Sequence, residues 1–93
     1  MLSIGGRMRQ FQHKILHEGG LHARVAVSLA GICRDYESRV FIQKGRLAGD
    51  CKDVFSMMNL KAGQGEVLTF VIEGTDEAEV EEQISQWILI FSF

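Results

Sequence analysis

The strongest constraint on the fold of this chain is the alternation of apolar side chains along residues 66–73. Every second position holds a large apolar residue, which places three of them on one face of an extended strand: Leu68, Phe70 and Ile72. Gly74 follows and interrupts the pattern. The alternation predicts a strand with one buried face, so other segments of the chain must cover that face.

The other segments switch between the period of a strand and the period of a helix. Three further strands are predicted, over residues 9–16, 39–44 and 46–49. The first of them draws its apolar positions from Phe11, Ile15 and Leu16. Three helices are predicted, over residues 23–36, over residues 54–60 and in the segment after Gly74. The first helix has its apolar residues at helical spacing: Val25, Ala26, Val27, Leu29, Ala30, Ile32 and Cys33.

Short polar residues mark the starts of the two later helices. Asp53 can cap the second helix, because its carboxylate can accept a hydrogen bond from a free amide of the first turn. Thr75 or Asp76 can cap the last helix in the same way. That helix has an acidic first turn, which suits the helix dipole, and an apolar stripe of Val80, Ile84, Trp87, Ile88 and Phe91.

This order of elements predicts an α+β fold in one domain over residues 1–93, with residues 1–8 as a flexible leader. Four strands and three helices can each bury one face if the helices cover one side of a single antiparallel sheet. The expected architecture is therefore an open-faced sandwich, a four-stranded antiparallel sheet covered on one face by three helices.

Composition and charge exclude several classes of protein. The net charge of −2 gives no overall attraction to nucleic acid. The N-terminus lacks the apolar run of a signal peptide, and no stretch reaches the roughly 20 residues of a membrane span. We therefore expect a cytoplasmic protein with no membrane insertion. Cys33 and Cys51 are too few for a disulfide framework and are expected to be buried, reduced thiols.

One short segment carries the residues suited to chemistry. A glycine pair at residues 19–20 delivers His22 to the start of the first helix, and Arg24 follows two residues later. A helix N-terminus favours a bound anion, and a cation in the first turn is better accommodated if an anion binds there. A neutral imidazole can attack phosphorus. The alternative is that His22 only caps the helix and Arg24 is solvated.

The sequence Gly-Leu-His-Ala-Arg-Val-Ala, residues 20–26, resembles the phosphorylation motif of the histidine-containing phosphocarrier (HPr) family of the bacterial sugar phosphotransferase system. It matches the motif except at Val25, where the family usually has proline. Residues 52–60 resemble the second helix of the family, and residues 62–65 resemble the loop after it. The resemblance covers about residues 9–88 and implies the HPr-like open-faced β-sandwich.

The resemblance implies a phosphoryl carrier rather than a conventional enzyme. It implies that His22 accepts a phosphoryl group from enzyme I and passes it to enzyme II A components. Arg24 and the backbone amide of Ala23 would stabilise the phosphoryl group. The resemblance implies no metal and no cofactor. His13 and His17 are four residues apart, on a strand and the following loop, and are not expected to bind a metal.

Asp53 departs from the family pattern, because many Gram-positive members carry a regulatory serine at this position. Asp53 either only caps the second helix or also mimics the phosphorylated serine through its permanent charge. The second possibility predicts a regulatory interaction module that docks partners without efficient phosphotransfer. A third possibility is an oligomerising domain in which His22 has no role.

Two apolar surfaces are candidate contacts with other proteins. The family docks partners through the exposed part of the second helix, which implies Val54, Phe55 and Met58 as contact residues. Lys52 and Lys61 can steer an acidic partner towards it. The C-terminal tail, residues 88–93, either continues the core or forms an exposed patch for self-association.

Overall fold

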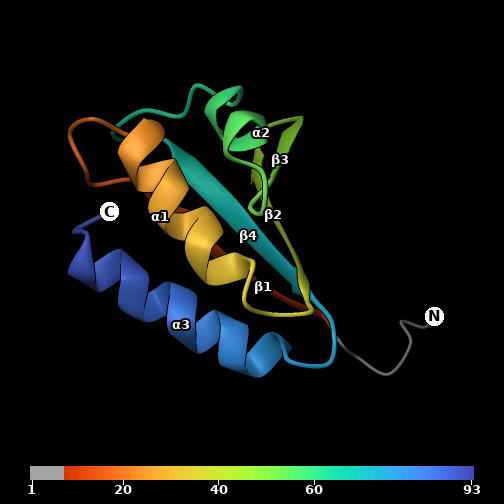
Figure 1. The fold of residues 1–93 in the computed structure, drawn as a ribbon. Helices are drawn as coiled ribbons and strands as arrows, with labels where there is room; N and C mark the ends of the chain where they lie inside the picture. Colours follow the sequence, from red (N-terminus) through yellow and green to blue (C-terminus); the bar gives the residue numbers. More distant parts are fainter. Residues whose placement is uncertain (1–7) are drawn as a thin grey trace.

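The computed structural model describes residues 8–93 and contains one antiparallel sheet (Figure 1). Its four strands are β1 (Met8–Lys14), β2 (Arg39–Lys44), β3 (Leu47–Asp50) and β4 (Val67–Glu73). They lie side by side in the order β1-β4-β2-β3. The last strand in the chain is therefore inserted between the first two.

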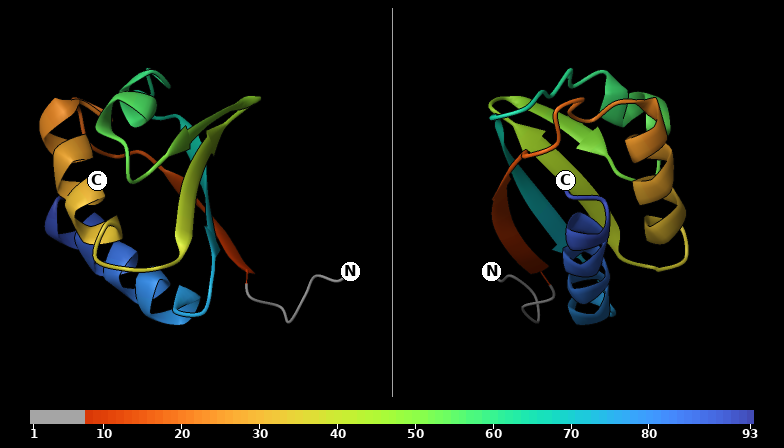
Figure 2. Two further views of the ribbon diagram at one scale, coloured as in Figure 1. Left: turned by 45° about the vertical axis from the view of Figure 1, so that its right-hand side comes forward. Right: turned by 90° about the vertical axis from the view of Figure 1, so that its left-hand side faces the viewer.

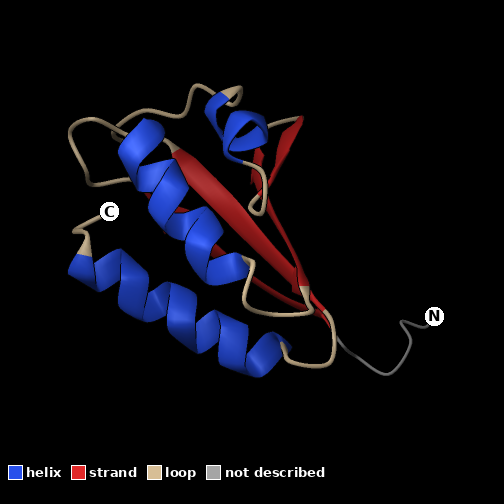
Figure 3. Ribbon diagram, in the orientation of Figure 1, coloured by secondary structure: helices blue, strands red, loops and turns tan. Residues whose placement is uncertain are grey.

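Three helices lie on one face of this sheet (Figure 2). They are α1 (Ala23–Cys33), α2 (Val54–Met58) and α3 (Glu77–Ile90). Within residues 8–93 the opposite face carries no helix, as the colouring by secondary structure shows (Figure 3). The predicted α+β open-faced sandwich is confirmed. No helix among the described residues is long and apolar enough to cross a membrane.

Strand β4 provides the centre of the core, as its alternating pattern predicts. Leu68, Phe70 and Ile72 are fully buried under the helices. Phe70 lies opposite Phe11 of β1, and the two rings stack with their centroids 4.9 Å apart. On its other side Phe70 lies opposite Ile42 of β2, which is also buried. Strand β4 therefore pairs with both β1 and β2, and its buried face meets apolar residues of both strands.

The first strand differs from the prediction at both ends. It begins at Met8, inside the segment predicted to be a flexible leader, because Met8 pairs with Glu73 of β4. The rest of that segment lies outside the described residues. The strand ends at Lys14, and Leu16 is 65 % exposed instead of contributing to the core.

The first two helices are shorter than predicted, because the chain forms a tighter turn after each of them. Helix α1 ends at Cys33 rather than at residue 36, and the amide of Tyr36 donates to the Cys33 carbonyl three residues back. Helix α2 ends at Met58 rather than at residue 60, again with bonds to carbonyls three residues back. Within α1, Val27 was expected to belong to the apolar stripe, but its side chain is 57 % exposed.

The two cysteines are buried free thiols, as predicted. Cys33 comes from α1, and Cys51 follows β3. Burial raises the pKa of the Cys51 thiol well above its ordinary value, and the contact with Cys33 raises it further. The Cys51 thiol therefore stays protonated, and both buried cysteine side chains pack as small apolar groups.

The C-terminal tail divides between core and surface. Ile88 and Phe91 pack partly against the core, as the stripe of α3 predicts. Phe93 is fully buried, and its ring centroid lies 5.0 Å from that of Trp87. Leu89 and Ile90 are 78 % and 76 % exposed. The tail thus completes the core and also leaves two apolar side chains in solvent.

Asp76 occupies the N-cap position of α3, but its carboxylate does not cap the helix. It accepts hydrogen bonds from the amides of Glu37 and Ser38, each 3.0 Å long, and from the Ser38 hydroxyl. Gly74 makes this approach possible, because a Cβ there would lie 2.7 Å from the Cα of Ser38. The carboxylate ties the turn before α3 to the loop between α1 and β2.

We predict that Asp76→Ala lowers the free energy of unfolding at pH 7 by about 1–3 kcal/mol, because the polar groups of buried Ser38 lose their acceptor. The hydrogen bonds, first that from the Ser38 hydroxyl, lower the pKa of Asp76 in the folded state. The stabilisation is therefore present at neutral pH and is lost as the pH falls below the ordinary value of 3.8. Urea denaturation at pH 7 and pH 3 should show a smaller effect at pH 3.

The matched control is Thr75→Ala, which removes the neighbouring exposed hydroxyl and should leave stability nearly unchanged. An equal effect of Asp76→Ala at both pH values would contradict the role assigned to the carboxylate.

Candidate functional site

His22 stands at the N-cap position of α1, with an extended backbone conformation. Its carbonyl accepts the first hydrogen bond of the helix, from the amide of Ala26 at 2.9 Å. Its imidazole caps no amide of the helix. The side chain is half-buried, so one part of the ring remains accessible. The possibility that His22 serves only as a cap is therefore not supported by the geometry.

The first turn of α1 offers the features expected of an anion site. Ala23 and Arg24 are exposed. The guanidinium of Arg24 has no hydrogen bond or ion pair within residues 8–93, and no acidic residue lies in this turn. Backbone amides at a helix N-terminus and a free cation both favour a visiting anion. The imidazole of His22 lies at the same end of the helix.

The loop before His22 is held by a close backbone contact with the loop after α2. The amide of Leu21 donates to the carbonyl of Ala62 at 3.0 Å, and the Leu21 side chain is buried. Gly20 has a φ of +65°, and a Cβ there would lie 2.5 Å from the same carbonyl oxygen. Only glycine fits at this point. The contact brings the start of α1 beside α2, as Figures 1 and 2 show.

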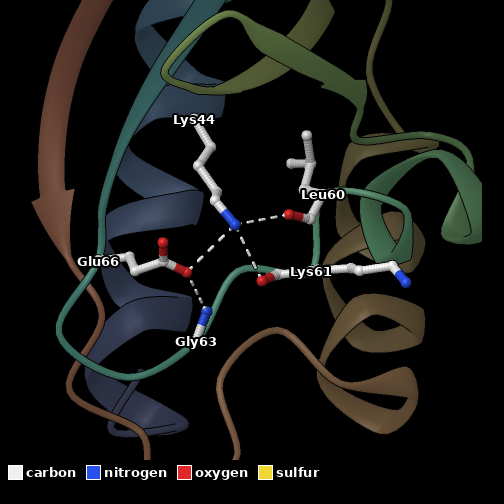
Figure 4. A network of polar contacts seen from close by, with 5 residues as sticks. All are labelled: Lys44, Leu60, Lys61, Gly63 and Glu66. Carbon is white, nitrogen blue, oxygen red and sulfur yellow. Dashed lines mark hydrogen bonds and ion pairs between the residues drawn. The ribbon is translucent and has the colours of Figure 1, made fainter.

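A polar network holds the loop on which Gly20 rests (Figure 4). The ammonium of Lys44, on β2, donates to the carbonyls of Leu60 and Lys61 at 2.9 and 3.0 Å. It also lies 3.3 Å from the carboxylate of Glu66, which accepts from the Gly63 amide at 2.7 Å. The bond from Gly63, and then the contact with Lys44, lower the pKa of Glu66. The network therefore persists at neutral pH.

The imidazole of His22 also meets a second histidine, which the sequence interpretation did not bring to the site. The Nε2 atoms of His17 and His22 lie 3.1 Å apart. Residues 17–20 form a tight turn, in which the amide of Gly20 donates to the carbonyl of His17 at 2.9 Å. The glycine pair at residues 19–20 lies between the two histidines and allows the chain to turn back on itself. This spacing was a signal for the contact.

Comparison with known proteins gives a consistent result. The family model for the PTS HPr component phosphorylation site matches residues 9–89. The HPr-like protein Crh of Halalkalibacterium halodurans is 30 % identical over 81 residues, which are 87 % of this chain and 96 % of that protein. The phosphocarrier protein HPr of Cupriavidus necator is 30 % identical over 77 residues, which are 83 % and 86 % of the two chains.

The chain belongs to the HPr family. A solved structure of the phosphocarrier protein HPr from Bacillus anthracis has a TM-score of 0.79 and 26 % identity, and the match covers 86 % of this chain and 95 % of that one. The predicted family and the HPr fold are both confirmed.

The second helix of this HPr-family chain has the mixed character that the sequence predicts. Phe55 is 77 % exposed and Met58 is 37 % exposed, whereas Val54 packs partly against the core. Met57 is the fully buried residue of the helix. We call Val54, Phe55 and Met58 the α2 patch. Helix α2, which carries this patch, lies beside the N-terminal end of α1 (Figures 1 and 2).

Asp53 caps α2 as predicted. A single carboxylate oxygen, Oδ1, accepts from the amides of Phe55 and Ser56 at 3.0 and 3.2 Å. Lys52, the preceding residue, directs its ammonium to the carbonyl of Tyr36 at 2.8 Å. Lys61 is exposed and has a φ of 51°. Of these two lysines, Lys61 is the one whose charge is exposed for a partner.

No group of three or more potential metal ligands gathers within residues 8–93. His13 lies apart from the other two histidines and stacks on Phe93, with ring centroids 5.6 Å apart. The histidine loop, residues 17–22, therefore brings together two imidazoles and a helix N-terminus.

We predict that Gly20→Ala lowers the free energy of unfolding by about 2 kcal/mol or more, because a positive φ and a backbone clash add together. The matched control is Gly45→Ala. Gly45 has a similar φ of +60° but open space around it, so this variant reports the conformational cost alone, about 1 kcal/mol. Urea denaturation measures both values. Equal losses in the two variants would show that the contact with Ala62 contributes nothing.

Proposed function

We propose that this protein accepts a phosphoryl group on Nδ1 of His22 from phosphorylated enzyme I and passes it to enzyme II A components. The observation that carries the proposal is the state of His22, whose imidazole stands at the N-cap of α1 without capping it. Membership of the HPr family supports the same reading. The contact with His17 is made by Nε2 of His22, so Nδ1 can act on a group brought by a partner.

The proposed chemistry needs only groups of this chain and the phosphoryl donor. The lone pair of Nδ1 attacks phosphorus, a nitrogen–phosphorus bond forms, and the bond to the donor breaks with its electron pair returning to the donor. The amide of Ala23 and the guanidinium of Arg24 stabilise the charge on the three phosphoryl oxygens. Transfer to the next protein reverses these steps.

The α2 patch supports docking of the two partner proteins in turn. Phe55 and Met58 expose apolar and flexible side chains beside the helix start that carries His22. A methionine-containing surface adapts to more than one partner. The exposed charge of Lys61 favours partners with acidic surfaces.

We predict that His22 takes up phosphate in an acid-labile, alkali-stable linkage, as expected for a phosphoramidate. The wild type should be labelled by enzyme I and phosphoenolpyruvate, and His22→Ala should lose all labelling. His13→Gln is the control, because it removes a histidine outside the histidine loop. Equal labelling of the wild type and His22→Ala would refute the assignment.

A second candidate function is a regulatory module that docks partners without efficient phosphotransfer. The observation that favours it is the geometry of Asp53. One oxygen of the carboxylate makes both capping bonds, and the other has no hydrogen bond within residues 8–93. Asp53 therefore caps α2 and still displays a negative charge beside the α2 patch. The similarity to an HPr-like protein named Crh agrees with this alternative.

We predict that Asp53→Ser speeds transfer from enzyme I about fivefold at low salt, because one like-charge contact with an acidic partner is removed. The gain should shrink at high salt as the charges are screened. Thermal stability should hardly change, because serine also caps helices well.

Asp50→Ser, which changes another acidic residue of the same strand-to-helix segment, controls for net charge. Identical rates for the wild type and Asp53→Ser at both salt concentrations would reduce Asp53 to a helix cap and remove the support for the regulatory alternative.

A further inference from the structure

The contact between His17 and His22 constrains where their protons lie. Their Nε2 atoms are 3.1 Å apart, and the ring centroids are 5.2 Å apart with the planes tilted by 40°. At this distance one nitrogen must donate a proton and the other must accept it. The pair is therefore incompatible with two fully protonated rings, in which all nitrogens are donors. A single proton joins the two imidazoles.

Gly19 provides the space for this pair. A Cβ at Gly19 would lie 2.7 Å from Cδ2 and 3.2 Å from Nε2 of His22, and 3.6 Å from Nε2 of His17. The φ of Gly19 is not in the positive range that favours glycine. Alanine is therefore compatible with the backbone at this position but not with the present place of the His22 ring.

We propose that His17 is a positioning residue for His22, because its Nε2 accepts the proton carried by Nε2 of His22. This assignment leaves the lone pair of His22 on Nδ1 as the only nucleophilic nitrogen of that ring. His17 then keeps its own proton on Nδ1. The inference rests on the proposed transfer to Nδ1 of His22 and adds a residue to that site.

The direction of the hydrogen bond follows from the charge that develops during transfer. When Nδ1 of His22 forms its bond to phosphorus, the bond to the donor breaks and the ring becomes more positive. Its Nε2–H then becomes a stronger donor, and a neutral acceptor stabilises it more than before. The proton remains on Nε2 of His22 throughout, so no additional base is required. The opposite direction would place a proton on Nδ1 and block the attack.

Nuclear magnetic resonance of the full chain with ¹⁵N-labelled histidine tests the pair before any phosphate is added. A scalar coupling between the two Nε2 atoms is expected, with the proton bonded to Nε2 of His22. EDTA is included to remove adventitious metal ions from the buffer, so that the coupling reports the proton between the two imidazoles. Absence of the coupling, or a proton bonded to Nε2 of His17, would overturn the proposal.

Transfer kinetics test the consequence of the pair. His17→Phe should slow phosphoryl transfer about tenfold, because the developing charge loses a hydrogen bond. Gly19→Ala should have a similar effect without altering either imidazole. His17→Gln should restore most of the rate, because its amide oxygen can accept the same proton. His13→Gln removes an imidazole outside the pair and outside the histidine loop, and it should transfer at the rate of the wild type.

Thermal unfolding of each variant shows whether a slow variant is also unfolded. An unchanged rate in folded His17→Phe would overturn the positioning role. A rate in His17→Gln as slow as in His17→Phe would also overturn it, because restoring a hydrogen-bond acceptor would then have no effect on phosphoryl transfer. A wild type that takes up no phosphate would instead refute the proposed function, while the coupling still decides whether His17 holds the proton of His22.

Discussion

The candidate site depends on the close approach of Gly20 to the backbone of Ala62. This approach fixes Leu21, whose amide bonds to Ala62 and whose side chain enters the core. His22 is the next residue, so its position relative to α2 is set by one backbone-to-backbone contact. A side chain at Gly20 would separate the two loops. The histidine and the α2 patch therefore form one surface only because glycine occupies this position.

That contact is useful only if the loop after α2 is itself immobile. Lys44 supplies this rigidity from the sheet, because its ammonium satisfies two carbonyls at the end of α2. Glu66 completes the arrangement from the start of β4 by accepting from Gly63. Lys44 is half-buried, so this is more than a solvent-exposed ion pair of negligible strength. The sheet thus helps to position the histidine loop through the loop after α2.

The C-terminal tail supports the histidine loop from the other side. The carbonyl of Phe93 accepts hydrogen bonds from the amides of Leu16 and His17. The ring of Phe93 packs against that of Trp87 at a tilt of 47° and is fully buried. The apolar tail therefore has a structural role next to the candidate site, whereas its exposed residues, Leu89 and Ile90, lie outside this contact.

Local patterns predicted those parts of the fold whose partners are local or periodic. The alternation of β4, the start of α1 at Ala23 and the cap at Asp53 follow from spacing and residue type, and the structure agrees with each. Asp76 was assigned the right position but the wrong partner. Its carboxylate bonds to residues 37–38, and no periodicity reports which distant amides will lie nearby. His17 was missed for the same reason, since its partner depends on how the loop turns.

The proposed function explains why few strong contacts surround His22. A phosphoryl carrier must release the group it receives, so the phosphorylated state cannot be much more stable than the phosphorylated partner. An exposed guanidinium is screened by water and salt, and backbone amides at a helix start are neutral donors. In the proposed function, exposed Arg24 and Ala23 would therefore stabilise the phosphoryl group only moderately. The proposed role of His17 agrees with a phosphorylated state of moderate stability, because a neutral acceptor orients the ring of His22 without adding a positive charge that would hold the phosphoryl group too tightly.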